Sequence, residues 1–293
     1  MVVNTWDGAA NTNWNDAGNW NSTGVTDRVP TSNDDVIIPD TSSTNNPTLT
    51  QDQPVQSLTM QANATVVGAG FKITIHGESS NVAVDNDAII SGNLDLEILT
   101  AGATTLDLAG TSGNFRNLTI NHASCNATLL SGATLDGNLT ITAGTLDTDS
   151  SNNYALTVAG HTAISSGGTL TLNASTCTFT GFLRNQGTFT GGSGTHTFGN
   201  GLRNDNNMTL TSGETRITGR GTGSLPDGNS TICFDDQGGT MNNGSGTINI
   251  GNGGDLGGTT NIRPSTSHDL NNVIINTTNS RTVKLESDCD IAG

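Results

Sequence analysis

Apolar residues along this chain come in short pairs, and one polar residue separates the two members of nearly every pair. The motif Asn-Leu-Thr-Ile, for example, occurs at 117–120 and again at 138–141. A period of two is typical of a β-strand with one buried face. The pairs are Leu58/Met60, Ile73/Ile75, Leu94/Leu96, Leu106/Leu108, Leu118/Ile120, Leu139/Ile141, Leu156/Val158, Leu170/Leu172, Met208/Leu210, Ile248/Ile250 and Val273/Ile275. The pattern predicts an all-β protein made of many short strands.

The strands recur at a regular interval. Leu118 and Leu139 occupy the same place in the two copies of the motif, which gives a repeat of about 21 residues. Gly, Asn, Asp and Ser fill the stretches between the pairs, and these residues tolerate the backbone conformations of tight corners. A repeat that buries its apolar face only against its neighbours predicts a right-handed parallel β-helix (a β-solenoid), with one repeat in each coil.

The inward-facing positions of stacked coils form rows along the axis of a solenoid. Three phenylalanines follow one another at intervals close to half a coil, which indicates an inward aromatic ladder. The residues assigned to the core ladder are Leu118, Ile120, Leu139, Ile141, Leu156, Val158, Leu170, Leu172, Phe179, Phe189 and Phe198.

Composition favours a thin core. Hydrophobic residues make up 32% of the chain and aromatic residues 4%, whereas a compact globular domain has roughly 45–50% apolar residues when glycine is counted. Charged residues are only 12%, so the chain lacks the high charge of a disordered protein. No stretch shows a helical period, and we expect almost no helix. A globular β-sandwich is the main alternative, which would need sharper hairpin turns and bulkier strands.

Residues 1–54 differ from the rest because they hold all three tryptophans. The first coil of a solenoid has an open apolar end and an unpaired edge, and large aromatic side chains can cover both. We therefore expect residues 1–54 to form a capping or docking module, and residues 55–293 to form the solenoid. A carbohydrate-stacking platform is the alternative role for the tryptophans. The residues assigned to the cap are Trp6, Trp14, Trp20, Val36, Ile37 and Ile38, the last three as a buried strand closed by Pro39.

The two ends of the chain suggest how it is used. The first residues lack the basic and apolar regions of a signal peptide, so either a signal has been removed or the protein reaches a surface without one. Residues 272–276 resemble 117–121, and the chain then ends at Gly293 without a visible closing cap. An uncapped coil presents unpaired backbone N–H and C=O groups with which another chain can pair. We expect the natural polypeptide to continue, or a partner chain to cover this end.

Charge narrows the range of partners. The net charge is −16, from 10 Lys and Arg against 26 Asp and Glu. Such a surface repels phosphate backbones and anionic membranes, so we expect neither nucleic acid nor a membrane as a partner. No segment approaches the roughly 18 consecutive apolar residues that span a bilayer.

The four cysteines are too widely spaced to form disulfides in the expected fold. Cys125, Cys177, Cys233 and Cys289 follow one another at intervals of about two and a half expected coils. With about 4.8 Å per coil, neighbouring cysteines would lie at least about 12 Å apart along the axis. A disulfide needs Cα atoms within about 7 Å. All four are therefore predicted to be free thiols, which fits assembly in a reducing compartment.

Calcium is the only cofactor that the sequence suggests. Asp85 and Asp87, and again Asp147 and Asp149, place oxygen ligands at alternate positions, as hard cations prefer. The usual role of such residues is a solvated turn, and no other metal is expected. The five histidines lack metal-ligand spacing, and the chain has no Cys-x-x-Cys motif.

Two pairs of acidic residues resemble the carboxylates of a glycosidase. Asp95 and Glu97 are two positions apart, and Asp235 and Asp236 are adjacent. Hydrolysis of a sugar needs two carboxylates that face the same glycosidic bond, and spacing in the sequence cannot establish that geometry. Such sites usually also have aromatic platforms, and Tyr154 is the only tyrosine in the chain. We therefore expect no catalytic residues.

The segment from Trp6 to Ile38 resembles the N-terminal module of large repetitive bacterial surface proteins and of tail or head fibres in marine phages. The matching motifs are Thr-Trp-Asp-Gly at 5–8, Asn-Trp at 19–20, Val-Pro at 29–30 and Asp-Asp-Val-Ile-Ile-Pro at 34–39. The resemblance extends over nearly the whole chain, although the repeats are of low specificity. It implies a β-helical fold and a role on a virion or cell surface, and it supplies no catalytic residues.

These observations lead to three hypotheses about function. The first is a structural protein of the virion surface, such as a phage fibre, spike or decoration protein, that acts in architecture or host attachment. Its partners would be other virion proteins or copies of itself, as a homotrimer, with a host surface glycan as a further candidate. The second is the stalk of an adhesin on the bacterial cell surface or outside the cell. The third is a β-helical polysaccharide depolymerase of the tailspike kind.

Overall fold

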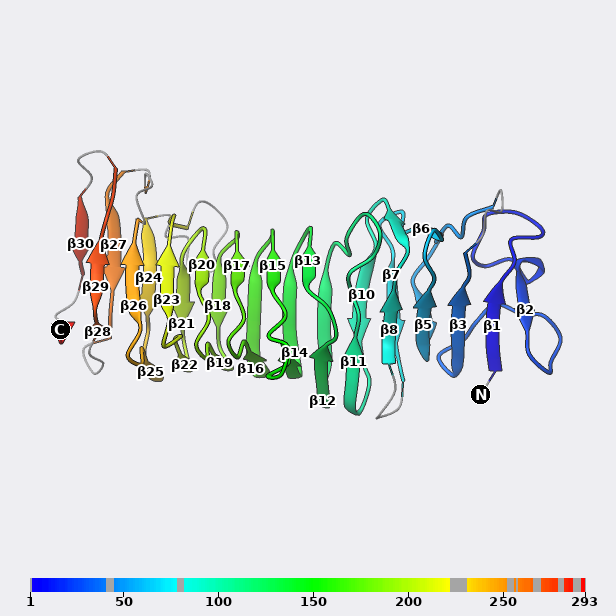
Figure 1. The fold of residues 1–293 in the computed structure, drawn as a ribbon, viewed down its shortest axis with the longest axis horizontal. Helices are drawn as coiled ribbons and strands as arrows, with labels where there is room; N and C mark the ends of the chain where they lie inside the picture. Colours follow the sequence, from blue (N-terminus) through cyan, green and yellow to red (C-terminus); the bar gives the residue numbers. More distant parts are fainter. Residues whose placement is uncertain are drawn as a thin grey trace. The chain divides into compact units, whose positions relative to one another are not determined.

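The protein is described by a computed structural model that covers residues 2–40, 45–77, 82–221, 231–251, 256, 258–265, 270–278, 282–286, 291 and 292. Within these residues, nearly all regular structure is β-strand, and the one helix is the short 3-10 turn η1 (Ala17–Asn19). The strands stack in parallel as the coils of a β-solenoid, which confirms the prediction of an all-β fold built from parallel coils (Figure 1). The chain divides into two compact units, Met1–Gly137 and Asn138–Gly293.

Unit 1 consists of three ladders of parallel strands, joined at its start by one antiparallel pair, β1 with β2. Its strands are β1 (Val2–Trp6), β2 (Trp20–Ser22), β3 (Asp34–Ile38), β4 (Gln53–Val55), β5 (Ser57–Met60), β6 (Thr65–Val67), β7 (Lys72–Ile75), β8 (Val82–Asn86), β9 (Ile89–Ser91), β10 (Asp95–Ile98), β11 (Gly102–Leu106), β12 (Leu118–Leu129) and β13 (Ala133–Leu135). One ladder runs β3–β5–β8–β11, a second runs β4–β7–β10–β12, and β6 pairs with β9.

Unit 2 repeats this three-sided arrangement. Its strands are β14 (Leu139–Asp147), β15 (Leu156–Val158), β16 (Thr162–Thr171), β17 (Cys177–Phe179), β18 (Leu183–Asn185), β19 (Thr188–Thr190), β20 (His196–Phe198), β21 (Leu202–Asn204), β22 (Asn207–Thr209), β23 (Glu214–Ile217), β24 (Ile232–Asp236), β25 (Thr240–Asn242), β26 (Thr247–Ile250), β27 (Thr260–Arg263), β28 (Leu270–Asn271), β29 (Val273–Ile275), β30 (Val283–Leu285) and β31 (Ile291–Ala292). The ladders are β18–β21–β24–β27–β30, β16–β19–β22–β25 and β15–β17–β20–β23–β26–β29.

The coils differ in length, so the regular period predicted from the sequence is wrong. Leu183 pairs with Leu202 across a short coil, whereas Ile217 pairs with Ile250 across a much longer one. The strands keep their register because their inward residues must meet the row below. The difference in length therefore falls outside the paired residues, where no such match is required.

Close contact between coils restricts the residues at some corners. Gly192 has a φ of +66°, in the left-handed region. A Cβ atom at this position would lie 1.7 Å from the carbonyl oxygen of Asn173, one coil away. Only glycine meets both conditions, since it has no Cβ atom and adopts positive φ at little cost.

The core of each unit is a set of narrow rows of inward side chains. Every residue of the expected core ladder is completely buried. The three phenylalanines, however, do not form one continuous row. Phe179 and Phe198 are directly paired on β17 and β20, and their rings stack with centroids 5.4 Å apart. Phe189 reaches the core from β19 in a different ladder, 6.3 Å from the ring of Phe198.

The tryptophans form a compact cluster at the start of unit 1. The ring of Trp20 contacts the rings of Trp6 and Trp14 edge to face, with centroid distances of 5.0 and 4.8 Å. All three side chains are at most 1% exposed, so none offers a free face on which a sugar could stack. On β3, Val36 and Ile38 are buried. Ile37 was expected to be buried with them, but it alternates to the outward face and is partly exposed.

The last described strands of unit 2 carry exposed apolar side chains. Ile275 and Leu285 continue the inward rows of the buried Ile250 and Ile262, yet they are 53% and 52% exposed. No coil among the described residues lies over them. Because side chains alternate between the two faces of a strand, those of Ile275 and Leu285 lie on the inward face. They would be buried only by a further layer stacked against them.

Candidate functional site

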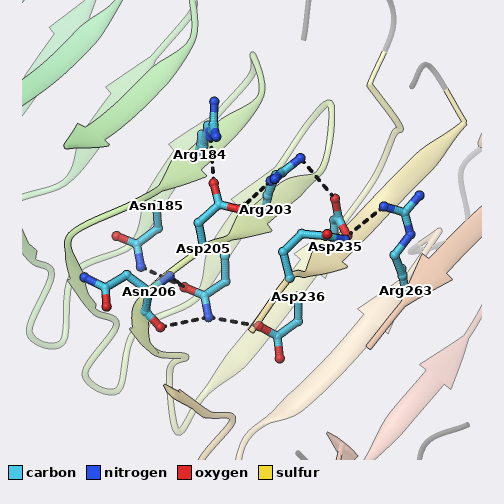
Figure 2. Close-up of polar contacts among 10 residues, drawn as sticks. Arg184, Asn185, Arg203, Asp205, Asn206, Asp235, Asp236 and Arg263 are labelled. Carbon is cyan, nitrogen blue, oxygen red and sulfur yellow. Dashed lines mark hydrogen bonds and ion pairs between the residues drawn. The ribbon is translucent and has the colours of Figure 1, made fainter. Parts of the chain in front are cut away.

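The most organised polar structure in unit 2 is a ladder of charged side chains, shown in Figure 2. Strands β18, β21, β24 and β27 pair in register, so equivalent residues of successive coils lie next to one another. One residue of each strand points outward because its neighbours point into the core. These outward residues are Arg184, Arg203, Asp235 and Arg263. We refer to them, together with Asp205 and Glu286, as the charged ladder.

Ion pairs connect the charged ladder from coil to coil (Figure 2). Asp205 follows β21 and accepts hydrogen bonds from Nε of Arg184 at 2.7 Å and from Nε of Arg203 at 2.6 Å. The carboxylate of Asp235 lies between Nη1 of Arg203, at 3.7 Å, and Nη1 of Arg263, at 3.5 Å. Arg263 then donates to Glu286 at 3.1 Å. Each charge of the ladder therefore has an opposite charge beside it.

Asp235 is the most deeply buried member of the charged ladder. It is 1% exposed, and a buried carboxylate is costly unless opposite charges or hydrogen bonds compensate it. Two arginines and the side-chain amide of Gln237 provide that compensation. Asp235 is therefore a buried carboxylate held between two guanidinium groups and an amide.

A second row of polar side chains points inward from β18, β21 and β24. Each of its residues directly follows a member of the charged ladder in the sequence. Asn185 donates to Oδ1 of Asn204 at 2.9 Å, and Asn204 donates to Oδ1 of Asp236 at 3.0 Å. All three side chains are at most 3% exposed. The side-chain oxygens also cap the turns that follow, since Gly187 N donates to Asn185 and Asn206 N donates to Asn204. The asparagines of this row thereby fix the turns that follow β18 and β21.

The two pairs of acids that resemble glycosidase carboxylates are held in other ways. Asp235 points outward and Asp236 inward, because adjacent residues of a strand alternate. The two carboxylates therefore do not face one sugar. In unit 1, Asp95 accepts two hydrogen bonds from Arg116 at 2.7 and 2.6 Å.

Glu97 lies on the same outward face of β10 as Asp95. It contacts Lys72 Nζ at 2.5 Å and the amide of Asn121 at 2.9 Å. Burial raises the pKa of Glu97, but these hydrogen bonds outweigh it and hold the pKa below its usual value. The hydrogen bond to Glu97 also raises the pKa of Lys72. A carboxyl group with a lowered pKa is a poor proton donor at neutral pH.

Asp85 has the opposite electrostatic environment. Burial raises its pKa, and the negative charges of Asp87 and Asp107 raise it further. Asp85 lies on β8 beside the coil that carries Asp107, and Asp107 accepts a hydrogen bond from Ser131 at 2.5 Å. Asp85 is thus a carboxyl group whose proton is held more tightly than usual, near a second carboxylate on the neighbouring coil.

The remaining calcium candidates take part in a turn. Asp147 accepts from the backbone N–H of Asp149 at 2.7 Å and from the amide of Asn173 at 2.7 Å. Asp149, with a φ of +66°, accepts from Ser151 N and from Asn152. Within the described part of the chain, no group of three or more His, Cys, Asp or Glu side chains is arranged to hold a metal ion.

Three of the four cysteines are placed by the structure. Cys125, Cys177 and Cys233 are buried free thiols, as predicted, and Cys289 lies outside the described residues. Burial raises the pKa of Cys125 to about 11 and the pKa values of Cys177 and Cys233 to about 12. Thiols with such pKa values are unreactive near neutral pH.

Sequence reasoning did not identify the charged ladder, although the sequence contains a signal for it. Leu-Arg-Asn occurs at 183–185 and again at 202–204. Two identical tripeptides one coil apart place two arginines and two asparagines in matching rows. The later members are harder to find, since Asp235 pairs with Arg203 across a longer coil and belongs to a different tripeptide.

Among the described residues, no helix is long and apolar enough to cross a membrane. Comparison of the chain with models of protein families, with curated proteins and with solved structures finds no match.

Proposed function

We propose that this protein is a structural component of a virion surface, a fibre, spike or decoration protein that acts in architecture or host attachment. The observation that carries the proposal is the charged ladder. Its carboxylates and guanidinium groups are paired with one another between coils. Groups used in this way stabilise a stack of coils and are not held ready for a substrate, as catalytic groups are.

Self-association is part of the proposal. A solenoid with thin coils has little core of its own, and burying the sides of three chains against one another adds stability, as in a homotrimer. Other virion proteins are the expected partners at the tryptophan-bearing end, and a host surface glycan is the expected ligand of the exposed coils. The acidic surface, with a net charge of −16, disfavours nucleic acid as a partner.

Immunoelectron microscopy of purified particles tests the proposal. Antibodies raised against the recombinant chain should label the outside of virions in material that carries the gene. Labelling of the bacterial envelope and not of particles would replace the proposal with the adhesin stalk. Absence of label from both would contradict both roles. Sedimentation equilibrium of the purified chain tests the trimer separately.

A polysaccharide depolymerase is the second candidate, and Asp85 is the observation that favours it. An acid with a raised pKa near a second carboxylate is the arrangement that glycoside hydrolysis requires. The test is incubation with host capsular polysaccharide and measurement of new reducing ends. If the chain is a depolymerase, Asp85→Asn should abolish their release, while Asp149→Asn in the turn of unit 2 should not. No release by the unmodified protein would eliminate this candidate.

A further inference from the structure

One side chain in unit 2 stands apart from the apolar core around it. His196 begins β20, and its imidazole ring is completely buried. It lies in an inward row between Cys177 on β17 and Thr215 on β23, to which it is directly paired in the ladder. Neither ring nitrogen makes a hydrogen bond of normal geometry, and neither does the hydroxyl of Thr215. Buried polar atoms without such bonds are rare in native proteins.

Among the described residues of β17, β19 and β23, no charged side chain faces His196 to stabilise a positive charge. The ring of Phe189 on β19 packs against it edge to face, with centroids 6.1 Å apart, and Gly191 lies close to Cε1. Of the described side chains that face the ring from β17, β19 and β23, only the thiol of Cys177 can ionise.

The charged residues of β23 are turned away from the ring. Glu214 and Arg216 alternate with the buried Thr215, lie on the outward face and form an ion pair at 2.7 Å. Burial lowers the pKa of His196 to about 4, although the backbone of Ser175 opposes part of the shift. At neutral pH the ring is therefore uncharged.

We propose that His196 is an acid-operated switch: its protonation opens the coils around β17, β20 and β23 and exposes the core of unit 2. In the closed fold, an imidazolium would sit in an apolar row without an anion to compensate it. In the open form, water solvates the charge. The proton therefore binds to the open form in preference to the closed one.

The direction and range of the effect follow from the two pKa values. The closed form has a pKa of about 4 at His196, and the exposed ring has the ordinary value of 6.5. Because the pKa is lower in the folded state, this group destabilises the fold as pH falls below about 6.5, and the effect is complete near pH 4. Between pH 7 and pH 4.5, the equilibrium constant for opening should increase on the order of 50-fold.

Labelling of Cys177 reports the opening, because its thiol lies next to His196 in the same row and is fully buried. The full chain is treated with 4,4′-dithiodipyridine, a disulfide reagent that reacts with thiols at acid pH, and the modified peptide is quantified by mass spectrometry. Each rate is divided by that of the chain unfolded in guanidinium at the same pH. The proposal requires the ratio for Cys177 to rise about 50-fold from pH 7 to pH 4.5.

Three variants isolate the histidine. His196→Leu should remove the roughly 50-fold share of the increase in the Cys177 labelling ratio that His196 contributes, while His76→Leu, which changes an exposed histidine in unit 1, should leave the increase intact. Carboxylates that titrate in the same range contribute equally to all chains and cancel in the comparison. If His196→Leu does not fold, His196→Gln keeps a polar but uncharged group and should also lack this share of the increase. An unchanged Cys177 ratio in the unmodified protein, or the same increase without His196, would overturn the proposal.

Discussion

Phe179 and Phe198 occupy the same position on successive coils, and their rings are nearly parallel, with an interplanar angle of 14°. The coil that separates them is one of the short ones, so no insertion disturbs the stack at this point. Both rings are completely buried. Aromatic rings bury a large apolar area each, which matters in a chain with only 4% aromatic residues.

Phe198→Ala should therefore destabilise unit 2 strongly. Loss of a buried phenylalanine leaves a cavity, and such changes cost about 3–5 kcal/mol. Urea denaturation followed by far-ultraviolet circular dichroism measures the loss. Thr197→Ala is the matched control, since Thr197 is the outward neighbour of Phe198 on the same strand. A loss of equal size in both variants would contradict the role assigned to the ring stack.

Removing one charge from the middle of the charged ladder should cost more than removing one from a more exposed ion pair. Arg203→Ala deprives the buried Asp235 of one of its two guanidinium groups. We expect a loss of roughly 1–3 kcal/mol, the usual cost of removing a partner from a buried polar group. Arg216→Ala breaks a more exposed pair with Glu214 and should cost less than about 1 kcal/mol. Equal losses in urea denaturation would show that the ladder adds no more than an ordinary surface pair.

Acid stability of unit 1 should depend on Asp34, which is 1% exposed. Burial raises its pKa, but hydrogen bonds from Arg28 and Thr31 outweigh it and leave the pKa below 3.8. Because the pKa is lowered by folding, the stabilisation is complete above about pH 3.8 and is lost as pH falls further, through the lower pKa of the folded state.

Asp34→Asn tests this relationship. The variant should be roughly 1–3 kcal/mol less stable at pH 7, because an amide replaces a carboxylate that accepts charge-assisted hydrogen bonds. The difference from the unmodified protein should shrink as the pH falls below 3.8. Tryptophan fluorescence follows unit 1 alone, since Trp6, Trp14 and Trp20 are the only tryptophans. Asp40→Asn, at an exposed position, is the matched control and should change the stability at pH 7 by less than about 0.5 kcal/mol.

The tryptophan cluster supplies a further test. Trp20 contacts the other two rings and donates from Nε1 to the carbonyl oxygen of Trp14 at 2.7 Å. Trp20→Ala should destabilise unit 1 by about 3–5 kcal/mol. If the cluster caps the solenoid, this variant should also self-associate in light scattering, because the edge of the first coil becomes accessible. If the variant is destabilised but does not self-associate, the cluster contributes to packing and the capping role is contradicted.

The sequence predicts the coils well because their physical cause is local. Alternation of apolar and polar residues places Leu118 and Ile120 inside by the geometry of the strand alone, and both are buried. The same rule puts Ile37 on the outward face, although its hydrophobicity suggests burial.

Features that depend on two coils at once are less accessible from the sequence. The pairing of Arg203 with Asp235 requires a register between β21 and β24 across a coil longer than the predicted repeat, and a fixed period does not provide it. The environment of His196 is harder still, because three strands and a facing phenylalanine together create it. The repeated Leu-Arg-Asn tripeptide reveals a different relationship, the alignment of Arg184 with Arg203 and of Asn185 with Asn204.

The corners of the coils set what kinds of change the protein can accept. The strands keep their pairing across coils of different length, so a peptide grafted between two strands, outside the paired residues, adds a loop without displacing the strands on either side. Loop closure becomes only slightly less favourable with length. Epitope tags, binding peptides and protease sites therefore have natural insertion points in this scaffold. A single residue added within a strand, in contrast, would move every following side chain of that strand to the opposite face of the sheet.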